Sequence, residues 1–222
     1  MGTLIALEGL DGAGKRTLVA KVVARLEQHG LRVATLDFPR YGASIHADLA
    51  SEALKGAHGD LSESVHAMAV MFALDRAGAA EQLKELLAAH DLVILDRYVA
   101  SNAAYGAARL HQHGDGEFVA WIEDLEFGRL GLPRPDLQMH LDVPVALAGE
   151  RARRREAGDS VRALDAYEKD SELQARTDAV YRELAAASWN SQWWTIAPDT
   201  DPGALAAKLA HLQQRDDTPQ QP

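Results

Sequence analysis

Short apolar runs that alternate with helical patterns constrain the fold of this chain more than any other feature. The runs occupy residues 3–8, 32–38, 91–96, 136–143 and 192–197. Between them, apolar side chains recur every three or four residues, which is the spacing of a helix with one buried face. This alternation predicts an α/β fold with a parallel five-stranded sheet and helices on both faces. Ligands of such sheets bind beyond the carboxyl ends of the strands.

The predicted helices and strands define one domain over residues 1–213. The helices occupy 15–29, 43–56, 61–89, 98–112, 115–130, a segment that starts at 144, 167–187 and 202–213. Gly30 is a typical residue for the end of the first helix. Asp60, followed three residues later by Glu63, predicts the start of the long third helix. Residues 214–222 are polar, and we expect them to be disordered.

Composition excludes several classes of protein. With no cysteine among 222 residues, the chain can form neither disulfides nor thiolate metal sites. The net charge of −10 argues against general binding of nucleic acid, which needs a basic face. No apolar stretch reaches the roughly 18 residues of a membrane span, and no signal peptide is expected at the start. We therefore expect a cytoplasmic protein that binds neither nucleic acid nor membranes.

The first predicted strand ends in a glycine-rich loop, GLDGAGKRT (9–17). It matches the phosphate-binding pattern G-x-x-x-x-G-K-[ST] except at position 16, where Arg16 replaces the hydroxyl residue that binds Mg²⁺. A strand before the loop and a helix after it favour a nucleotide site over a glycine-rich turn with a surface lysine. The candidate ATP-binding residues in the loop are Gly9, Leu10, Asp11, Gly12, Ala13, Gly14, Lys15, Arg16 and Thr17.

Two acids lie close to this loop. Asp11 would repel phosphates, so it is expected either to hold a cation or to accept a hydrogen bond from a second substrate. The alternative is that Asp11 only binds N–H groups of the loop. Asp96 ends the most apolar strand, where the Walker-B acid of phosphate-loop proteins stands and can bind Mg²⁺ directly or through water. The alternative for Asp96 is a cap on the following helix.

Arginines at the ends of two strands predict a second anion site. Arg97 follows Asp96 directly, and Arg40 lies in FPRYG (38–42), together with Phe38, Pro39 and Tyr41. An arginine grips a phosphate with two parallel hydrogen bonds. Two such arginines beside a phosphate loop therefore indicate that the second substrate is itself phosphorylated.

Two predicted helices carry residues suited to a planar base. Phe72 and Arg76 are four residues apart and share a helix face, so the ring can stack on a base while the guanidinium binds its edge. The alternative is a core phenylalanine beside a solvated arginine. Asn102 and Tyr105, three residues apart on the next helix, can face the same crevice.

An arginine-rich segment, RARRR (151–155), is unusual in so acidic a chain. It precedes a Gly-Asp-Ser loop and predicts a lid, at about 149–163, that closes positive charge over transferring phosphates. Arg151, Arg155 and Arg162 can share one helix face. An ordinary exposed charged face is the alternative.

Taken together, these motifs resemble the thymidylate kinase family over nearly the whole chain. EGLDGAGK, FPRYG, FALDRAG, DRYVASNAAY, GLPRPD and the arginine-rich segment followed by D-x-YE occur in the family's order. The resemblance implies transfer of the γ-phosphoryl group of ATP to dTMP, giving dTDP and ADP, with Mg²⁺ as cofactor, and it implies a homodimer. Its implied catalytic residues are Asp11, Lys15, Arg97, Arg151 and Arg155.

The resemblance also assigns roles in binding dTMP. Phe72 would stack on thymine while Arg76 and Asn102 bind its edge, and Arg40 and Arg97 would hold the phosphate. The full set of implied dTMP-binding residues is Asp11, Phe38, Pro39, Arg40, Tyr41, Phe72, Arg76, Arg97, Asn102, Tyr105, Arg162 and Tyr167. Tyr105 would crowd the 2′ position and disfavour ribonucleotides. The implied metal ligands are Asp11, Asp96 and Glu168.

The family has two arrangements, and in one of them the catalytic arginine follows the aspartate of the phosphate loop. Here that position is Gly12, so the chain resembles the type with a lid arginine, for which Arg155 is the first candidate and Arg151 the second. Arg16 departs from the usual GKST, so we expect a working phosphate loop whose metal-binding role has moved. Asp11 is the leading candidate for the cation, with Asp96 and Glu168 as direct or water-linked partners, and Arg16 adds a cation on the phosphate side. Two alternatives remain: another small nucleotide or deoxynucleoside kinase, and a nucleotide-binding module without catalysis.

Overall fold

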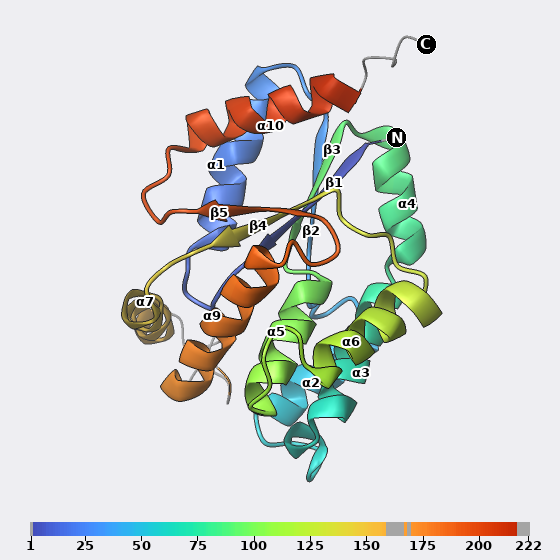
Figure 1. Cartoon of the computed structure of the whole chain (residues 1–222), viewed down its shortest axis with the longest axis vertical. Helices are drawn as coiled ribbons and strands as arrows, with labels where there is room; N and C mark the ends of the chain where they lie inside the picture. The colour runs from blue at the N-terminus through green and yellow to red at the C-terminus, as the bar shows by residue number, and fades with distance from the viewer. Residues whose placement is uncertain (1, 159–166, 168–169, 217–222) are drawn as a thin grey trace.

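The computed structural model describes residues 2–158, 167 and 170–216. Within these residues five parallel strands form one sheet in the order β2-β3-β1-β4-β5 (Figure 1), which confirms the predicted α/β fold. The strands are β1 (Thr3–Glu8), β2 (Val33–Asp37), β3 (Leu92–Asp96), β4 (Leu137–Leu141) and β5 (Gln192–Ile196). Each lies within one residue or two of a predicted apolar run.

The register of the strands brings charged residues together at the carboxyl edge of the sheet. Asp37 of β2 pairs with Asp96 of β3, and Glu8 of β1 pairs with His140 of β4. Paired residues in a sheet project to the same face, so each pair shares a face. Four of the five strands therefore deliver a titratable side chain to the edge where ligands of such sheets bind.

Alternate residues of β1 form two separate cores. Ile5 and Leu7 pack with Leu26 of α1 (Lys15–Gln28) and with α10 (Pro202–Asp216). Leu4 and Ala6 pack on the other face, with α4 (Ala80–Ala89), α5 (Val99–Arg109), α6 (Glu117–Glu123) and α9 (Ser171–Ala186). Figure 1 shows α1 and α10 together on one side of the sheet and α5, α6 and α9 on the other. Helices thus cover both faces, as the sequence predicts.

The prediction of one long helix over 61–89 is wrong, because the segment is interrupted at two places. A short turn, η1 (Leu61–Glu63), precedes α3 (Val65–Ala77), and α4 begins only at Ala80. Ser64, and not Asp60, is the N-cap of α3, since the backbone N–H of Ala67 donates to its hydroxyl at 3.2 Å. Gly78 is the C-cap residue of α3, with a φ of −64°, and α4 begins two residues later.

Other boundaries differ less. The segment 43–56 forms α2 (Ile45–Leu54), and the segment 115–130 forms α6 followed by a π-helical turn, η2 (Asp124–Arg129). Helix α10 continues to Asp216, beyond the predicted boundary at 213, and its buried Gln213 accepts a hydrogen bond from the Thr3 hydroxyl at 2.5 Å. Residues 217–222 of the predicted tail lie outside the described residues.

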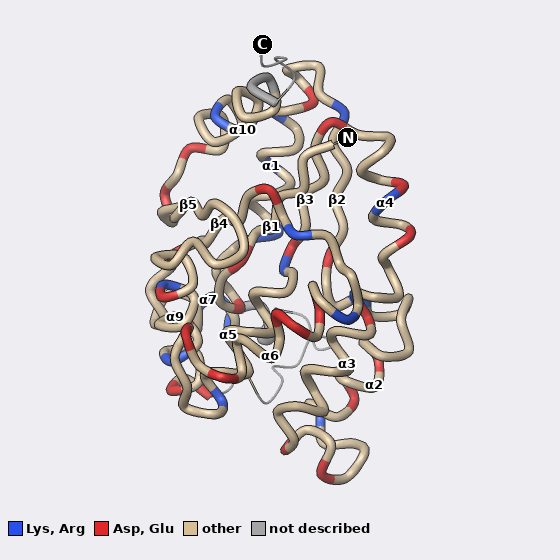
Figure 2. The backbone as a smooth tube through the Cα atoms, turned by 45° about the vertical axis from the view of Figure 1, so that its right-hand side comes forward, with Lys and Arg blue, Asp and Glu red and all other residues tan. Residues whose placement is uncertain are grey.

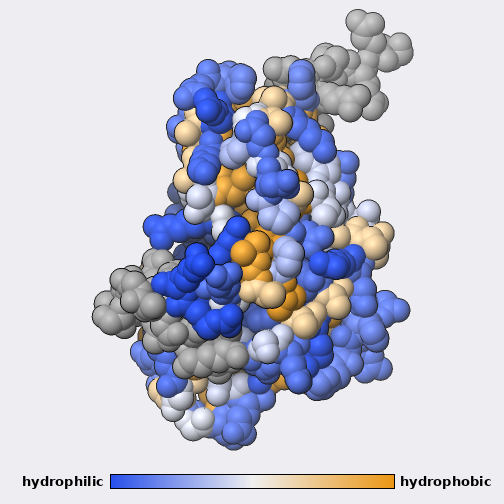
Figure 3. Space-filling model, turned by 90° about the vertical axis from the view of Figure 1, so that its left-hand side faces the viewer, coloured by the Kyte–Doolittle hydropathy of each residue, from blue (hydrophilic) through white to orange (hydrophobic). Residues whose placement is uncertain are grey.

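The predicted lid begins on α7 (Val145–Gly158), and the remainder of it, 159–163, lies outside the described residues. Figure 3 shows a strongly hydrophilic patch on the face that carries α7, where Arg151, Arg153 and Arg154 are exposed. Figure 2 shows that acidic residues are spread along the whole backbone and not gathered in one segment. Among the described helices, none is both long and apolar enough to cross a membrane.

Candidate active site

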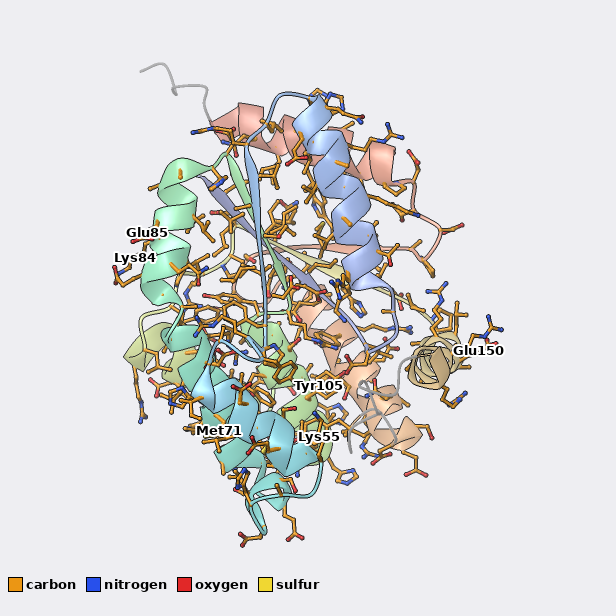
Figure 4. The ribbon with its side chains drawn as sticks, turned by 180° about the vertical axis from the view of Figure 1, so that it is seen from behind. Lys55, Met71, Lys84, Glu85, Tyr105 and Glu150 are labelled. Carbon is orange, nitrogen blue, oxygen red and sulfur yellow. The ribbon has the colours of Figure 1, made fainter. Side chains whose placement is uncertain are left out.

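A cavity of about 680 Å³ lies beyond the carboxyl ends of the strands. In Figure 4, Tyr105 lies in this region, with α2 and α3 on one side and α7 on the other. The predicted site residues that line the cavity are Asp11, Gly12, Gly14, Lys15, Arg16, Thr17, Phe38, Pro39, Tyr41, Phe72, Arg76, Asp96, Arg97, Asn102, Tyr105, Arg151 and Tyr167. Residues from widely separated parts of the sequence therefore meet at one site, as the parallel sheet predicts.

The phosphate loop turns directly into the first turn of α1. Gly12 and Gly14 have φ angles of 77° and 99°, in the left-handed region that glycine adopts without a steric penalty. The buried ammonium of Lys15 donates to the carbonyl oxygens of Gly9 and Leu10 at 3.1 and 2.9 Å. Burial, together with the charge of Arg97, lowers the pKa of Lys15 to about 8. The loop thus brings a lysine and the start of a helix to one end of the cavity.

Helix α7 sits directly on this loop. A Cβ atom at Gly12 would collide with the backbone oxygen of Ala148, near the start of α7. One turn later, Arg151 donates to the carbonyl oxygen of Ala13 at 3.1 Å. Arg155 follows Arg151 by four residues on the same helix, but its side chain lies outside the described residues. The contact at Gly12 fixes the base of α7, so the arginines of this helix start from a defined place beside the loop.

Asp11, Arg97 and Tyr105 form a compact polar cluster. Arg97 Nη2 donates to Asp11 Oδ1 at 2.6 Å, and the Tyr105 hydroxyl donates to Asp11 Oδ2 at 2.8 Å. Burial would raise the pKa of Asp11, but the charges of Arg97 and Lys15 outweigh it and lower the pKa to about 2. Asp11 is therefore an anion at neutral pH, and both of its oxygens are committed to neighbours.

Buried residues support Arg97 from behind. Arg97 has a φ of 68°, a conformation that costs a residue with a side chain on the order of 1 kcal/mol or more. Its Nη1 lies 3.0 Å from the Ser101 hydroxyl and 3.4 Å from that of Tyr181. Both hydroxyls donate to Glu8 Oε2, at 2.6 and 3.0 Å. Arg97 thus projects from a strained turn that several partners hold.

Phe72, Arg76 and Asn102 line another part of the cavity. Arg76 is buried and donates through Nε and Nη2 to the two oxygens of Glu126, at 2.5 and 2.7 Å. The Asn102 side-chain amide donates to Glu126 Oε1 at 2.8 Å and to the carbonyl oxygen of Ala69 at 2.9 Å. Glu126 comes from the π-helical turn η2, whose extra residue per turn directs it inward. One buried carboxylate therefore orients two residues of the cavity wall.

Arg40 takes a different position from the other predicted phosphate ligands. Its Nε lies 2.9 Å from Asp75 Oδ1, and its Nη2 donates to the Asp75 carbonyl oxygen at 2.7 Å. Arg40 is not among the residues of the cavity wall, although its neighbours Phe38, Pro39 and Tyr41 are. In this conformation, Arg40 supports the wall from behind.

Asp96 and Asp37 lie side by side at the strand ends, and both line the cavity with Arg16. Partial burial and the Asp96 carboxylate raise the pKa of Asp37, while Arg16 opposes this shift. Asp96 Oδ1 is buried and has no hydrogen-bond partner among the described residues. A buried carboxylate oxygen without a donor is costly unless a ligand completes it.

Tyr167 approaches from the chain beyond the lid. Its ring stacks on Tyr105 at 6.0 Å between centroids, and its hydroxyl accepts from Arg109 Nη1 at 2.5 Å. Arg109 also donates to the carbonyl oxygens of Ser62 and Glu63, at 2.7 and 3.1 Å. This link closes one side of the cavity over α5.

Comparison with known proteins identifies the family to which a chain with this site belongs. A sequence model of the thymidylate kinase family matches residues 7–201, which include the phosphate loop and all five strand ends. The chain belongs to the thymidylate kinase family.

Relatives that carry the family name cover most of the chain. Thymidylate kinases of Mycobacterium tuberculosis strains CDC 1551 and H37Rv are each 59% identical over 207 residues, which is 93% of this chain and 97% of each relative. The thymidylate kinase of Thermomicrobium roseum is 32% identical, over 93% of this chain and 91% of its own. The human thymidylate kinase is 32% identical over 68% of this chain and 65% of its own.

Membership of the thymidylate kinase family does not by itself assign the side chains around the cavity. The predicted residues Arg162 and Glu168 lie outside the described residues. The sequence patterns also missed neighbours that contact the predicted residues: the buried Glu8, Asp75, Ser101, Glu126 and Tyr181, the partly buried Arg109, and Asp37 at the exposed end of β2. Asp75 lies within FALDRAG and Ser101 within DRYVASNAAY, so these motifs were a signal for two of them. Nothing in the local pattern marks Glu126 or Tyr181.

Proposed function

We propose that this enzyme transfers the γ-phosphoryl group of ATP to dTMP, giving dTDP and ADP. The observation that carries the proposal is the arrangement of a single cavity. Its wall includes the phosphate loop with Lys15, the partly buried cationic group of Arg97, and the flat side chain of Phe72. A donor triphosphate, an acceptor phosphate and an acceptor base would each meet a suitable surface there.

The thymine site would be formed by Phe72, Arg76 and Asn102. Because both hydrogens of the Asn102 amide go to Glu126 and Ala69, its carbonyl oxygen is left to accept from N3–H of thymine. Arg76 keeps further N–H groups for the O4 oxygen, while Phe72 provides a stacking surface. Cytosine presents a donor at position 4 and an acceptor at N3, so this pattern of groups disfavours dCMP.

The phosphate of dTMP would bind Arg97, whose guanidinium is already aimed into the cavity beside Asp11. Tyr105, held by Asp11, would crowd the sugar and disfavour a 2′-hydroxyl. Arg40, which Asp75 holds, and Arg162 are the remaining phosphate candidates from the family resemblance. The attacking nucleophile would be an oxygen of the dTMP phosphate, which is already an anion. The reaction therefore needs alignment and charge compensation but no strong general base.

The γ-phosphoryl group of ATP would lie over the phosphate loop, where Lys15 exchanges its loop carbonyl partners for phosphate oxygens. Arg151, which donates to the carbonyl oxygen of Ala13 in that loop and lines the cavity, would be a second cation for the same oxygens. Arg155 remains the first candidate from the sequence for a lid arginine. These cations would offset the repulsion between two phosphorylated substrates and the charge of the transferring group.

Of the predicted metal ligands, Asp96 is the best suited to bind Mg²⁺. Asp96 has a buried oxygen without a partner among the described residues, whereas both oxygens of Asp11 are already taken by Arg97 and Tyr105. We therefore propose Asp96 as the principal holder of Mg²⁺, directly or through water, and Asp11 as the second; Glu168 remains a sequence prediction. Mg²⁺ bound with few protein ligands and several phosphate oxygens would shield the charge of ATP.

A panel of acceptors tests the proposal. With ATP and Mg²⁺, dTMP should be phosphorylated faster than dUMP, dCMP, AMP, GMP or thymidine, as measured by ADP release and by chromatography of the product. A strong preference for thymidine would contradict a monophosphate acceptor. Binding of ATP and dTMP without dTDP formation would instead indicate a non-catalytic module.

Two variants test the proposed roles of Arg97 and Arg155. Arg97→Ala should reduce turnover of dTMP by 100-fold or more, on the order of the loss expected for a charged contact to the reacting phosphate. If Arg155→Ala retains full turnover, the lid assignment is wrong but the kinase assignment stands. We also propose, from the sequence and the resemblance, that the enzyme is a cytoplasmic homodimer; light scattering after gel filtration tests the dimer.

A further inference from the structure

Glu8 is a buried carboxylate to which the proposed reaction gives no role. It ends β1, immediately before the phosphate loop, and has 0% of its surface exposed. It lies on the same face of the sheet as its paired neighbour His140, under α5 and α9. Burying a carboxylate is costly, so its hydrogen-bond partners indicate what it stabilises.

Glu8 grips the turn that carries Arg97 at its backbone. Glu8 Oε1 accepts from the backbone N–H of Tyr98 at 2.8 Å. Tyr98 is the N-cap of α5, and its own side chain caps nothing. A carboxylate from another strand therefore occupies the place of a cap at the positive end of α5. This contact secures the strained residue Arg97, one position earlier.

Glu8 also orients the hydroxyls that support the Arg97 side chain. Its Oε2 accepts from Ser101 and Tyr181, and both of these oxygens lie within reach of Arg97 Nη1. A guanidinium has donors only, so each hydroxyl must turn its hydrogen away from Arg97 to accept from it. The acceptors on that side are Glu8 Oε2, to which both hydroxyls donate, and the two hydroxyl oxygens themselves, which lie 2.7 Å apart. With Nη1 held in this way, Nη2 faces Asp11 and the cavity.

We propose that Glu8 is a positioning residue for the acceptor phosphate, acting through Ser101, Tyr181 and the Tyr98 backbone to fix Arg97. The inference rests on the proposed role of Arg97 in binding the phosphate of dTMP. It predicts a selective defect, because a misplaced guanidinium weakens contact with the phosphate and leaves the thymine site of Phe72, Arg76 and Asn102 unchanged.

Glu8→Gln tests the inference with almost no change of shape. In one orientation the new amide sets an N–H group against the Tyr98 N–H, and in the other it replaces the oxygen to which both hydroxyls donate, so part of the support of Arg97 is lost in either case. We expect the dissociation constant of dTMP, measured by calorimetry, to rise about tenfold or more. The dissociation constant of thymidine, which has no phosphate, should change less than about twofold. Equal weakening of both ligands would overturn the inference.

A matched control is Thr3→Val, at the opposite end of the same strand. Thr3 is buried, and its hydroxyl donates to Gln213. The variant therefore removes a buried hydrogen bond of β1, as Glu8→Gln does, but at a residue that does not contact Arg97. Both dissociation constants should stay at their original values. Should Glu8→Gln fail to fold, Ser101→Ala and Tyr181→Phe should each show a smaller loss with the same selectivity for dTMP; no loss in either would also overturn the inference.

Combination with Arg97→Ala separates this inference from the proposed function. In the Arg97→Ala background, Glu8→Gln should add almost nothing to the loss of dTMP binding, because its effect passes through Arg97. Additive losses would contradict the positioning role. If Arg97→Ala alone leaves dTMP binding unchanged, the assignment of Arg97 fails. If Arg97→Ala weakens dTMP but Glu8→Gln does not, only the inference about Glu8 fails.

Discussion

Removal of Glu126 should destabilise the enzyme more than any surface substitution. Glu126 and Arg76 have side-chain exposures of 0% and 4%, and two hydrogen bonds of 2.5 and 2.7 Å join them. Glu126→Ala leaves the buried guanidinium without a counter-charge and Asn102 without one of its acceptors. Loss of one partner from a buried pair costs roughly 3–5 kcal/mol. This is a large part of the roughly 5–15 kcal/mol that holds a typical domain folded.

Urea unfolding followed by tryptophan fluorescence measures this loss, and the melting temperature should fall by about 10 °C. Asp124→Ala is the matched control, since it removes an exposed ion pair with Arg129 from the same turn and should cost less than about 1 kcal/mol. The double variant Arg76→Met with Glu126→Leu should regain most of the stability and none of the dTMP binding. A loss for Glu126→Ala no larger than that of the control would refute the reasoning, because the pair would then be solvated.

Three further predictions concern the phosphate loop and the sheet. Gly12→Ala should lower turnover and stability together, because the new methyl group must displace Ala148 and the base of α7; activity equal to the original enzyme would contradict this contact. Arg16→Ser should raise the pKa of Asp37 and change the Mg²⁺ concentration for half-maximal rate; an unchanged Mg²⁺ titration would make Arg16 a bystander. Burial lowers the pKa of His140 to about 4, below its usual value near 6.5. The unfolded chain therefore binds the proton first, and stability should fall by up to about 3 kcal/mol as the pH drops from 6.5 to 4. His140→Gln should remove much of this dependence in unfolding experiments at each pH.

The sequence was sufficient for the sheet and for many residues of the cavity wall, although Asp37, Ser101 and Arg109 of that wall were missed and Arg40 lies outside it. Apolar runs predict strands, and parallel strands collect their ends at one edge, so Asp96 and Arg97 were expected beside Lys15. The broken helix at 61–89 shows the limit of this reasoning. Residues 65–89 keep a helical apolar spacing across Gly78, yet α3 ends at Ala77 and α4 begins at Ala80, and the Ser64 cap accounts only for where α3 begins.

The buried partners of the site could not be predicted from the sequence, because each one pairs residues far apart in the chain. Arg76 and Asn102 meet Glu126 only when a π-helical turn directs that residue inward. Glu8 meets Tyr181 across almost the whole chain length. Such carboxylates look like ordinary surface acids in the sequence. Their function becomes visible only from the cations and hydroxyls around them.

The close approach of Gly12 to Ala148 also limits what position 12 of this chain can hold. The start of α7 fills the space that any side chain there would need. A substitution at position 12 would therefore give a clash before it gave a new functional group. A larger residue could be accommodated only if the base of α7 moved first, so the loop and the helix can change only together.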